Sequence, residues 1–287
     1  MIRILITGKG SYIGTHFLNY LKVNFPSQYE VDELDMMGNE WKDYDFSKYD
    51  VVYHVAGLAH STPDESQRDL YYHVNTDLCY ETAVKAKNEG VKQFIFMSSI
   101  IVYGSGEIGK PRIITRDTPL TPDNFYGDSK KQAEIKITPL NDENFKVCII
   151  RPPMIYGRNS KGNYPLLAKF AKKTPIFPTL NNERSMLYVG NLVEFIRLMI
   201  DNKESGVFLP QNEEYVSSKE LVRQVSSICG HRVLFTGVFN PILKLMSKNT
   251  YVNKVFGNLT IDKRLSQYKQ KYCRYSFEES IRLTEGE

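Results

Sequence analysis

The first half of the chain alternates short apolar runs with stretches whose apolar residues repeat at helical spacing. This alternation predicts parallel strands joined by covering helices, because each apolar run has the length of a buried strand. The strands are expected at residues 2–7, 29–34, 50–55, 93–98 and 145–151. The helices are expected at about 12–23, 66–88 and 126–138, with only a turn of helix in 35–49.

After Arg151 the alternation weakens, and the stretches RNSKGNYPLL and KKTPIFPTLNNE have the composition of loops. The following stretch, SMLYVGNLVEFIRLMIDNKESGVFLP, predicts a strand, a helix and a strand. Two more helices are expected at 217–229 and 277–283, with a Lys-rich apolar stretch at 240–256. No repeat or low-complexity linker separates the halves, so two intertwined lobes are expected.

The composition narrows the class of protein. With 41% hydrophobic residues, 24% charged residues and a formal charge of +4, the chain has the composition of an ordinary globular protein. It has no long basic stripe for nucleic acid, and its basic patches are interpreted as solvated faces. The four cysteines are far apart in the chain, which indicates a reducing compartment and no zinc site. No apolar run reaches the roughly 20 residues of a membrane span, so we expect a cytoplasmic protein without a metal.

The stretch TGKGSYIG, residues 7–14, follows the first strand and precedes a helix. A glycine turn that leads into a helix can hold a pyrophosphate, because the helix N-terminus presents free N–H groups and partial positive charge. Gly8 and Gly14 fit the first and last glycines of the pattern T-G-x-x-G-x-x-G. Ser11 stands at the position of its middle glycine, with Gly10 beside it. A hydroxyl at Ser11 could itself donate to phosphate. The alternative is a plain strand-to-helix turn.

An acidic residue after the second strand bears on the choice of dinucleotide. Asp35 lies 27 residues beyond Gly8, where an acid accepts hydrogen bonds from ribose hydroxyls and repels a 2'-phosphate. Asp32 competes for this role, and Lys9 in the glycine turn would favour a 2'-phosphate. NAD is therefore favoured, with NADP as the alternative.

A phenol with a lysine partner and a pair of serines also suit hydride transfer. Tyr126 and Lys130 are four residues apart, so on a helix they share a face, and the ammonium is expected to lower the pKa of the phenol. Ser98 and Ser99 end an apolar run, at the carboxyl end of a strand where open α/β sheets bind ligands. A hydroxyl, a phenol with a lysine partner and a dinucleotide turn meet the needs of oxidation at a sugar or alcohol carbon.

With these pieces the chain resembles the extended short-chain dehydrogenases/reductases, in particular the NAD-dependent sugar epimerases and dehydratases related to UDP-glucose 4-epimerase. The motifs that carry the resemblance occur in family order over nearly the whole chain. They are TGKGSYIG, VVYHVAG, Asn75 in YHVN, MSSIIVYG, YGDSK, IIRPPMIYG, RSMLYVGNLV and YSFEESI. The resemblance implies an α/β fold: a Rossmann-like doubly wound parallel sheet with a smaller intertwined C-terminal substrate lobe. The NAD(P)-binding domain is expected at 1–155, completed by 184–209, and the substrate lobe mainly at 156–287.

The resemblance also assigns roles to residues. It implies that Ser99, with Ser98 as the weaker candidate, is the active-site hydroxyl and Tyr126 the acid–base group, while Lys130 binds the nicotinamide ribose and tunes Tyr126. Asn75 would hold the local structure of the site, or be an ordinary helix residue. The residues expected to contact the cofactor are Gly8, Ser11, Tyr12, Ile13, Gly14, Asp35, Ala56, Gly57, Asn75 and Lys130.

The residues after Ser99 restrict the reaction. Sugar 4,6-dehydratases of this family carry Asp-Glu there, and decarboxylating relatives keep a glutamate, whereas this chain has Ile100 and Ile101. The site is thus expected to perform only reversible oxidation at one carbon. An NAD-dependent 4-epimerase and an NAD(P)H-dependent 4-keto-sugar reductase both fit, and a non-catalytic dinucleotide sensor is a third reading.

The substrate implied by the resemblance is a nucleotide sugar. Its diphosphate end is expected near Asn163 and Arg184, although Arg184 could instead form a surface ion pair. Met154 stands where UDP-galactose epimerases usually have asparagine, and Ala59 and His60 follow VAGL where those epimerases have a lysine. A UDP-hexose or UDP-N-acetylhexosamine is expected, with a 6-deoxy or lipid-diphosphate-linked sugar left open. The family also implies a homodimer through two helices.

Overall fold

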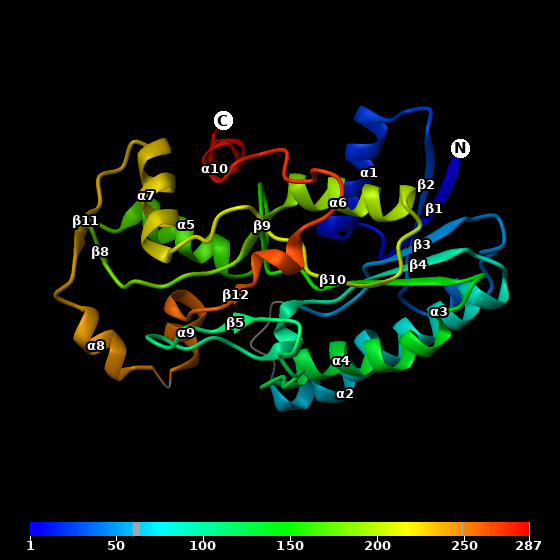
Figure 1. The fold of residues 1–287 in the computed structure, drawn as a ribbon, viewed down its shortest axis with the longest axis horizontal. Coiled ribbons are helices and arrows are strands. Elements are labelled where there is room, and N and C mark those ends of the chain that lie inside the picture. The colour runs from blue at the N-terminus through cyan, green and yellow to red at the C-terminus, as the bar shows by residue number, and fades with distance from the viewer. Residues whose placement is uncertain (60–63, 248, 287) are drawn as a thin grey trace. The chain divides into compact units, whose positions relative to one another are not determined.

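The computed structural model describes residues 1–59, 64–247 and 249–286. Contacts within the chain divide it into two units, each built from several segments (Figure 1). Unit 1 comprises residues 1–102, 120–151 and 193–209, and unit 2 comprises 103–119, 152–192 and 210–287. Residues 103–119 and 184–192 thus lie in unit 2, whereas the sequence boundaries put them with the first domain.

Unit 1 is built on a six-stranded parallel sheet with the strand order β10-β6-β4-β3-β1-β2. Its strands are β1 (Ile2–Thr7), β2 (Tyr29–Leu34), β3 (Val51–His54), β4 (Gln93–Met97), β6 (Lys146–Ile150) and β10 (Gly206–Phe208). The order reverses between β1 and β3, which makes the sheet doubly wound and places a switch point at the carboxyl ends of these strands. The expected doubly wound α/β fold is confirmed.

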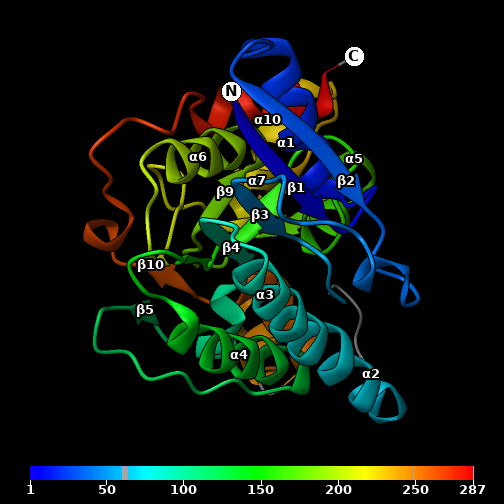
Figure 2. The ribbon, with the colours of Figure 1, turned by 90° about the vertical axis from the view of Figure 1, so that its right-hand side faces the viewer.

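Helices cover both faces of this sheet. The helices that belong wholly or partly to unit 1 are α1 (Tyr12–Asn24), α2 (Arg68–Tyr72), α3 (Leu78–Asn88), α4 (Phe125–Ile137) and α6 (Val189–Asp201). Figure 2 shows α3 and α4 side by side, and their Ala83 and Ala133 pack with Phe94 and Val147 of the sheet. On α1, Phe17 meets Tyr53 of β3 at 5.4 Å between ring centroids. The central strands β3 and β4 are therefore buried on both faces, as their continuous apolar runs predict.

Most elements of unit 1 begin and end within a residue of the sequence prediction. The expected helix at 66–88 is divided, because a π-helical turn, η3 (His73–Asp77), separates α2 from α3. A short 3-10 turn, η2 (Glu65–Gln67), precedes them, and η5 (Thr138–Leu140) follows α4. The expected single turn in 35–49 is η1 (Glu40–Lys42). A π turn inside a helix often marks a functional position.

Unit 2 has its own apolar core, formed by short parallel strand pairs and helices. The strands are β5 (Ile113–Ile114), β7 (Met154–Tyr156), β8 (Ile176–Pro178), β9 (Met186–Tyr188), β11 (Leu234–Thr236) and β12 (Thr260–Ile261). The helices are α5 (Asn163–Lys173), α7 (Ser218–Ile228), α8 (Asn240–Leu245), α9 (Thr250–Phe256) and α10 (Phe277–Glu285), with the 3-10 turn η6 (Lys263–Ser266).

The expectation of loops after Arg151 is wrong in part. The stretch from Asn163 to Lys173 is helix α5, whose buried residues Tyr164, Leu167 and Ala171 follow helical spacing. The helix begins after Gly162, which has a φ of +91°. Within the described residues, no helix combines the length and the apolar character that a membrane crossing requires.

Candidate active site

The glycine turn brings the start of α1 against the ends of β1 and β3. Gly8 has a φ of +117°, and a Cβ there would lie 2.7 Å from the backbone nitrogen of Ala56. A Cβ at Gly14 would lie 3.0 Å from Cγ2 of Ile6. Gly10 has a φ of +71° and open space at the position of a Cβ. Two glycines are thus required by close packing, and the third by its backbone conformation.

Ser11 is the N-cap of α1, and Tyr12 and Ile13 are the first two residues of that helix. The Ser11 hydroxyl accepts a hydrogen bond from the Gly14 N–H at 3.2 Å. Ser11 therefore has a structural role, whether or not its O–H also donates to a ligand. The N-terminus of α1, with its partial positive charge, follows directly from the turn.

The acids at the end of β2 have different surroundings. Asp32 accepts a hydrogen bond from the Tyr49 hydroxyl at 2.6 Å, so its carboxylate already has a partner within unit 1. Asp35 is exposed, and one of its oxygens accepts from the Met37 N–H at 3.0 Å. Sequence reasoning missed Glu33, whose carboxylate accepts from the Gly10 N–H of the glycine turn at 3.2 Å. The signal for it was the acid-rich end of this strand.

Asn75 lies in the π turn and joins three parts of unit 1. Its Oδ1 accepts from the Leu58 N–H at 2.8 Å, and its Nδ2 donates to the Leu58 carbonyl at 3.2 Å and to Ser129 Oγ at 3.0 Å. A Cβ at Gly57 would lie 3.0 Å from Asn75 Oδ1 and 3.0 Å from Lys130 Nζ. Asn75 thus fixes the loop after β3 against α4, and Gly57 leaves room for both side chains.

Lys130 is buried beneath this loop. Its Nζ donates to the Met97 carbonyl at 3.0 Å and lies 4.8 Å from the Phe96 ring centroid. Burial lowers the pKa of Lys130 to about 8, and the nearby Cys79 and Glu134 oppose that shift. Part of the Lys130 population is therefore neutral just above neutral pH.

The Ser99 side chain acts on the pKa of the Tyr126 phenol. Burial raises the pKa of Tyr126 to about 12, the Ser99 side chain lowers it, and Tyr71, at 6.1 Å between ring centroids, raises it. Lys130 is not among the causes of this shift, because burial dominates and the Lys130 ammonium donates to a backbone carbonyl, so its effect on the phenol stays a prediction. Helical spacing alone does not fix where a side chain points.

The two neighbouring serines after β4 differ in their contacts. Ser98 is buried and donates to the carboxylate of Glu134, which is paired with Arg151. Ser99 is partly exposed, and its Oγ also accepts from the Ile101 N–H at 3.3 Å. Of the two serines, only Ser99 acts on the pKa of Tyr126.

The residues after Ser99 bring no acid to the site. Ile100 is buried and Ile101 is partly buried in the turn η4 (Ile100–Tyr103). The first turn of α4 packs on this turn, since a Cβ at Gly127 would lie 2.8 Å from the Ile101 carbonyl oxygen. This turn therefore places apolar side chains, and no carboxylate, directly after Ser99.

Arg184 and Asn163, the two residues expected at the diphosphate, both belong to unit 2. Asn163 is the first residue of α5. Arg184 donates to the backbone carbonyls of Lys254 at 2.6 Å and Asn253 at 3.3 Å, both in α9. Burial lowers its pKa to about 10. The alternative of a surface ion pair is thus wrong within the described residues, because Arg184 binds carbonyls of a helix. Met154 is the first residue of β7, and His60 lies outside the described residues.

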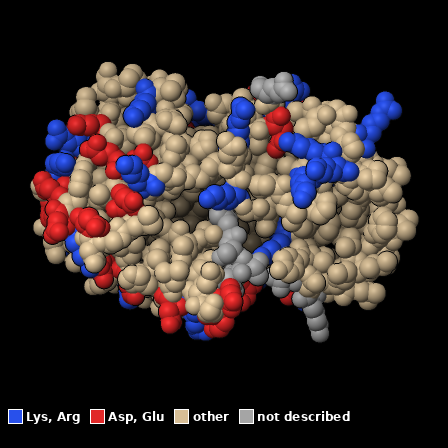
Figure 3. All heavy atoms as spheres, turned by 180° about the vertical axis from the view of Figure 1, so that it is seen from behind, with Lys and Arg blue, Asp and Glu red and all other residues tan. Residues whose placement is uncertain are grey.

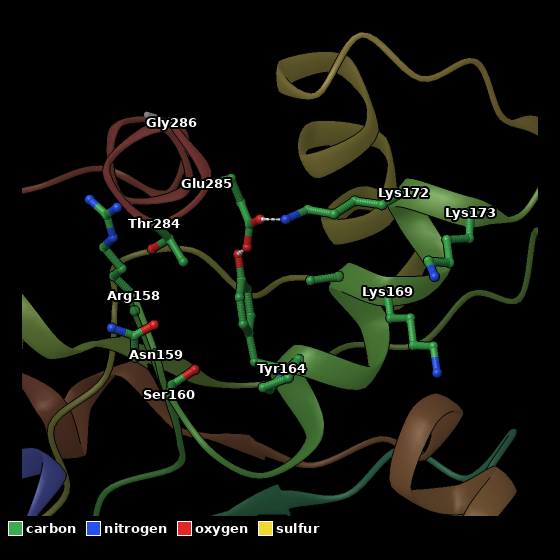
Figure 4. Close-up of a pocket in the computed structure, with 13 residues that line it drawn as sticks. Arg158, Asn159, Ser160, Tyr164, Lys169, Lys172, Lys173, Thr284, Glu285 and Gly286 are labelled. Atoms are coloured by element: carbon green, nitrogen blue, oxygen red, sulfur yellow. Dashed lines mark hydrogen bonds and ion pairs between the residues drawn. The ribbon is translucent and has the colours of Figure 1, made fainter.

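A groove of ≈ 520 Å³ in unit 2 contains none of the predicted site residues (Figure 4). Its walls carry Arg158 and three lysines of α5, and Glu285 lies among them. Glu285 accepts from the Tyr164 hydroxyl at 2.7 Å and pairs with Lys172 at 2.6 Å. Within the described part of the chain, no three His, Cys, Asp or Glu side chains are grouped as metal ligands would be.

The doubly wound sheet and the glycine turn at its switch point define the class of the protein: a nucleotide-binding α/β fold. The family model described as "NAD dependent epimerase/dehydratase family" matches residues 4–213. UDP-glucose 4-epimerase of Vibrio cholerae is 30% identical over 285 residues, covering 90% of this chain and 87% of that protein. The chain belongs to the NAD dependent epimerase/dehydratase family and is therefore an enzyme.

Two other similarities are informative. N-acetyl-alpha-D-glucosaminyl-diphospho-ditrans,octacis-undecaprenol 4-epimerase of Escherichia coli O157:H7 is 28% identical, over 80% of this chain and 73% of that protein. The solved structure of UDP-glucuronic acid 4-epimerase from Bacillus cereus in complex with NAD has a TM-score of 0.76 at 18% identity, covering 99% of this chain and 95% of that one. The latter likeness supports the fold. The expectation of an NAD cofactor is confirmed at the level of the family.

Proposed function

We propose that the chain is an NAD-dependent sugar 4-epimerase acting on a UDP-hexose or UDP-N-acetylhexosamine. The observation that carries the proposal is the action of the Ser99 side chain on the phenol of Tyr126, with buried Lys130 one turn further along α4. Ile100 and Ile101 follow Ser99 where an elimination would need further acid and base groups. Such a site suits reversible oxidation at one carbon and no other step.

The glycine turn of unit 1 fits a dinucleotide. Gly8 and Gly14 allow close approach of β1, β3 and α1, and Gly10 leaves open space beside the N-terminus of α1. The pyrophosphate would be held there by Ser11, Tyr12 and Ile13. Asp35 or Glu33 would accept from the ribose hydroxyls, and Ala56, Gly57 and Asn75 would border the rest of the cofactor. Unit 1 is thus proposed as the NAD-binding domain and unit 2 mainly as the substrate lobe.

NAD, when bound, supplies the two-electron oxidation and reduction at the sugar carbon. Tyr126 Oη takes the proton of the sugar 4-hydroxyl as C4 is oxidised to the ketone, and returns a proton as C4 is reduced. Reduction on the opposite face of the keto sugar inverts C4, so atoms and electrons balance over one cycle. Ser99 Oγ–H donates to the sugar oxygen and stabilises its developing charge.

Lys130 supports this proton transfer through its position. Its ammonium is held by the Met97 carbonyl at 3.0 Å, below the loop that Asn75 fixes. There it would bind a ribose hydroxyl of NAD and favour the phenolate of Tyr126 once substrate and cofactor exclude water. In the structure without ligands the phenol is protonated at neutral pH, because burial raises the pKa of Tyr126 to about 12.

The substrate assignment draws on the relatives and on unit 2. The Vibrio cholerae relative is named a UDP-glucose 4-epimerase and the Escherichia coli relative a 4-epimerase of an undecaprenol-linked sugar. We propose that Asn163 and Arg184 bind the diphosphate that both substrates share. Two donors of Arg184 bind helix carbonyls, which orients the guanidinium and leaves its Nε–H for phosphate. A homodimer and a cytoplasmic location remain part of the proposal, and light scattering and cell fractionation test them.

The proposal is tested with purified protein and a panel of UDP-sugars. Products are separated by chromatography and identified by nuclear magnetic resonance, without added NADPH, and the co-purified nucleotide is identified in the same sample. The expected result is a 4-epimer formed over many turnovers with NAD bound to the protein. A requirement for one equivalent of NADPH per product would contradict it and indicate a 4-keto-sugar reductase.

A further inference from the structure

Two segments of unit 2 contain no carboxylate side chain. Residues 152–182 hold five Lys or Arg and no Asp or Glu, and residues 221–261 hold another five and again no acid. The elements β8, β11 and α8 of these segments lie at the left-hand edge of Figure 1 and hence at the right-hand edge of Figure 3, where no Asp or Glu is visible. These segments therefore supply cations and no acids of their own, although Lys172 and Arg223 pair with Glu285 and Glu220 of neighbouring segments.

The same segments also expose apolar side chains. They make up a quarter of the chain but hold ten of the twenty exposed large apolar residues that the structure describes. Six of them follow one another along β8, β11 and α8 and are here called the apolar ridge: Ile176, Leu234, Val238, Phe239, Ile242 and Leu245. Leu245 is 85% exposed and Val238 75% exposed. Single exposed apolar residues are ordinary, whereas a contiguous set marks an interaction surface.

The ridge is held in place by packing beneath it. Ile176 and Leu234 are paired in the β8–β11 ladder. Their neighbours Phe177 and Phe235 contact each other at 6.4 Å between ring centroids, on the core side. On α8, Leu243 packs against the same core, so that Ile242 and Leu245 lie outward. The outward residues are thus a fixed feature of unit 2.

Basic side chains flank the ridge. Lys244 lies between Leu243 and Leu245 on α8, and Arg232 precedes β11 by two residues. Both are exposed, and neither forms an ion pair with any residue that the structure describes. An apolar set edged by unpaired cations has the chemistry of a surface that enters the headgroup region of an anionic bilayer.

We propose that the apolar ridge, with Lys244 and Arg232, docks the protein on the surface of an anionic lipid bilayer. The ridge side chains enter the boundary between headgroups and acyl chains, while the cations contact lipid phosphates. A second copy of the chain suits the ridge less well, because a face-to-face pair would bring these cations together without a carboxylate in either segment. This docking goes beyond the proposed function: it would bring the enzyme to a bilayer, where a lipid-linked sugar of the kind in the name of the Escherichia coli relative could also reach it.

The test is vesicle sedimentation with the full-length protein. Vesicles of phosphatidylcholine alone are compared with vesicles of phosphatidylcholine and phosphatidylglycerol in equal parts. The expected result is binding to the anionic vesicles only, weakened by salt. The double variant Ile242→Ser, Leu245→Ser should bind about 10-fold more weakly. Lys244→Gln and Arg232→Gln should each weaken binding about 5-fold.

The matched control is Val23→Ser, which removes an apolar side chain 78% exposed on α1 of unit 1 and should bind as wild type. All variants should keep the wild-type rate with a water-soluble UDP-sugar, which also shows that they fold. Absence of vesicle binding, or equal binding by the ridge variants, would overturn the proposal. So would a dimer in light scattering that Leu245→Ser dissociates. Sedimentation measures vesicle binding and needs no turnover. The binding result therefore tests the docking surface even if the proposed reaction is not observed.

Discussion

Replacement of Ser99 by alanine is expected to lower activity, whereas replacement of Ser98 by alanine is expected to lower stability. Ser99→Ala removes the partly exposed hydroxyl that lowers the pKa of Tyr126. Ser98→Ala removes a buried hydroxyl that donates to Glu134 and has no described contact with Tyr126. The two variants delete the same atom at adjacent positions, so each is the control for the other.

The expected magnitudes differ accordingly. Loss of a donor to the developing charge costs about 10²- to 10³-fold in kcat/KM, which is the effect expected for Ser99→Ala. Because the Ser99 side chain lowers the pKa of Tyr126, its loss raises that pKa, and the rising limb of the pH–rate profile moves to higher pH. Loss of a hydrogen bond to a buried carboxylate costs about 1.5–3 kcal/mol of stability, the effect expected for Ser98→Ala.

The assay pairs steady-state kinetics across pH with thermal unfolding. Ser99→Ala should melt at nearly the wild-type temperature, whereas the Tm of Ser98→Ala should fall by roughly 3 to 10 °C. Ser98→Ala should keep most of its kcat/KM at a temperature where it is folded. Equal loss of activity in both variants would refute the reasoning, as would a Ser99→Ala variant that keeps wild-type kinetics.

Three further predictions concern Tyr126, the glycine turn and Lys130. Tyr126→Phe should lower kcat by about 10²- to 10⁴-fold while NAD binding, followed by fluorescence, is retained; an unchanged kcat would refute its role. Gly8→Ala, whose Cβ would lie 2.7 Å from the Ala56 nitrogen at a φ of +117°, should cost about 1–3 kcal/mol and release the co-purified dinucleotide. Gly90→Ala, also at positive φ but with open space, should keep the dinucleotide. Lys130 has a pKa of about 8 in the folded chain against 10.5 as its ordinary value, so the unfolded chain binds more protons between these values and stability rises with pH. Between about pH 8 and about pH 10, the free energy of unfolding of wild type should rise by on the order of 2 kcal/mol relative to that of Lys130→Met, as measured by denaturant unfolding. No relative rise would contradict the burial of the ammonium.

The sheet of unit 1 could be predicted from the sequence because its signal is local. The central strands β1, β3, β4 and β6 are mostly buried runs of apolar residues, and two helices carry side-chain caps, Ser11 before α1 and Asn124 before α4. Helix α5 was missed although Tyr164, Leu167 and Ala171 have helical spacing, because Gly162 and nearby prolines have the composition of a loop. Proline is tolerated in the first turn of a helix, which is where Pro165 lies.

The side chains of the candidate site could be chosen from the sequence, but their electrostatics could not. The spacing of Tyr126 and Lys130 puts both on α4, yet the direction of the phenol pKa depends on burial, which only the packed structure provides. The role of Glu33 at the glycine turn depends on the pairing of β1 with β2. Arg184 reaches carbonyls of α9 about seventy residues away in sequence, a contact that no local pattern indicates.

The account's central claim is that C4 of the sugar is oxidised and then reduced on its other face. Epimerisation in deuterated water, with the product examined by nuclear magnetic resonance, tests this claim most directly. The account predicts a 4-epimer without deuterium at C4, because that hydrogen leaves and returns without exchange with solvent while only the Tyr126 proton exchanges. Deuterium at C4 would contradict it, since the hydrogen would then have left as a proton.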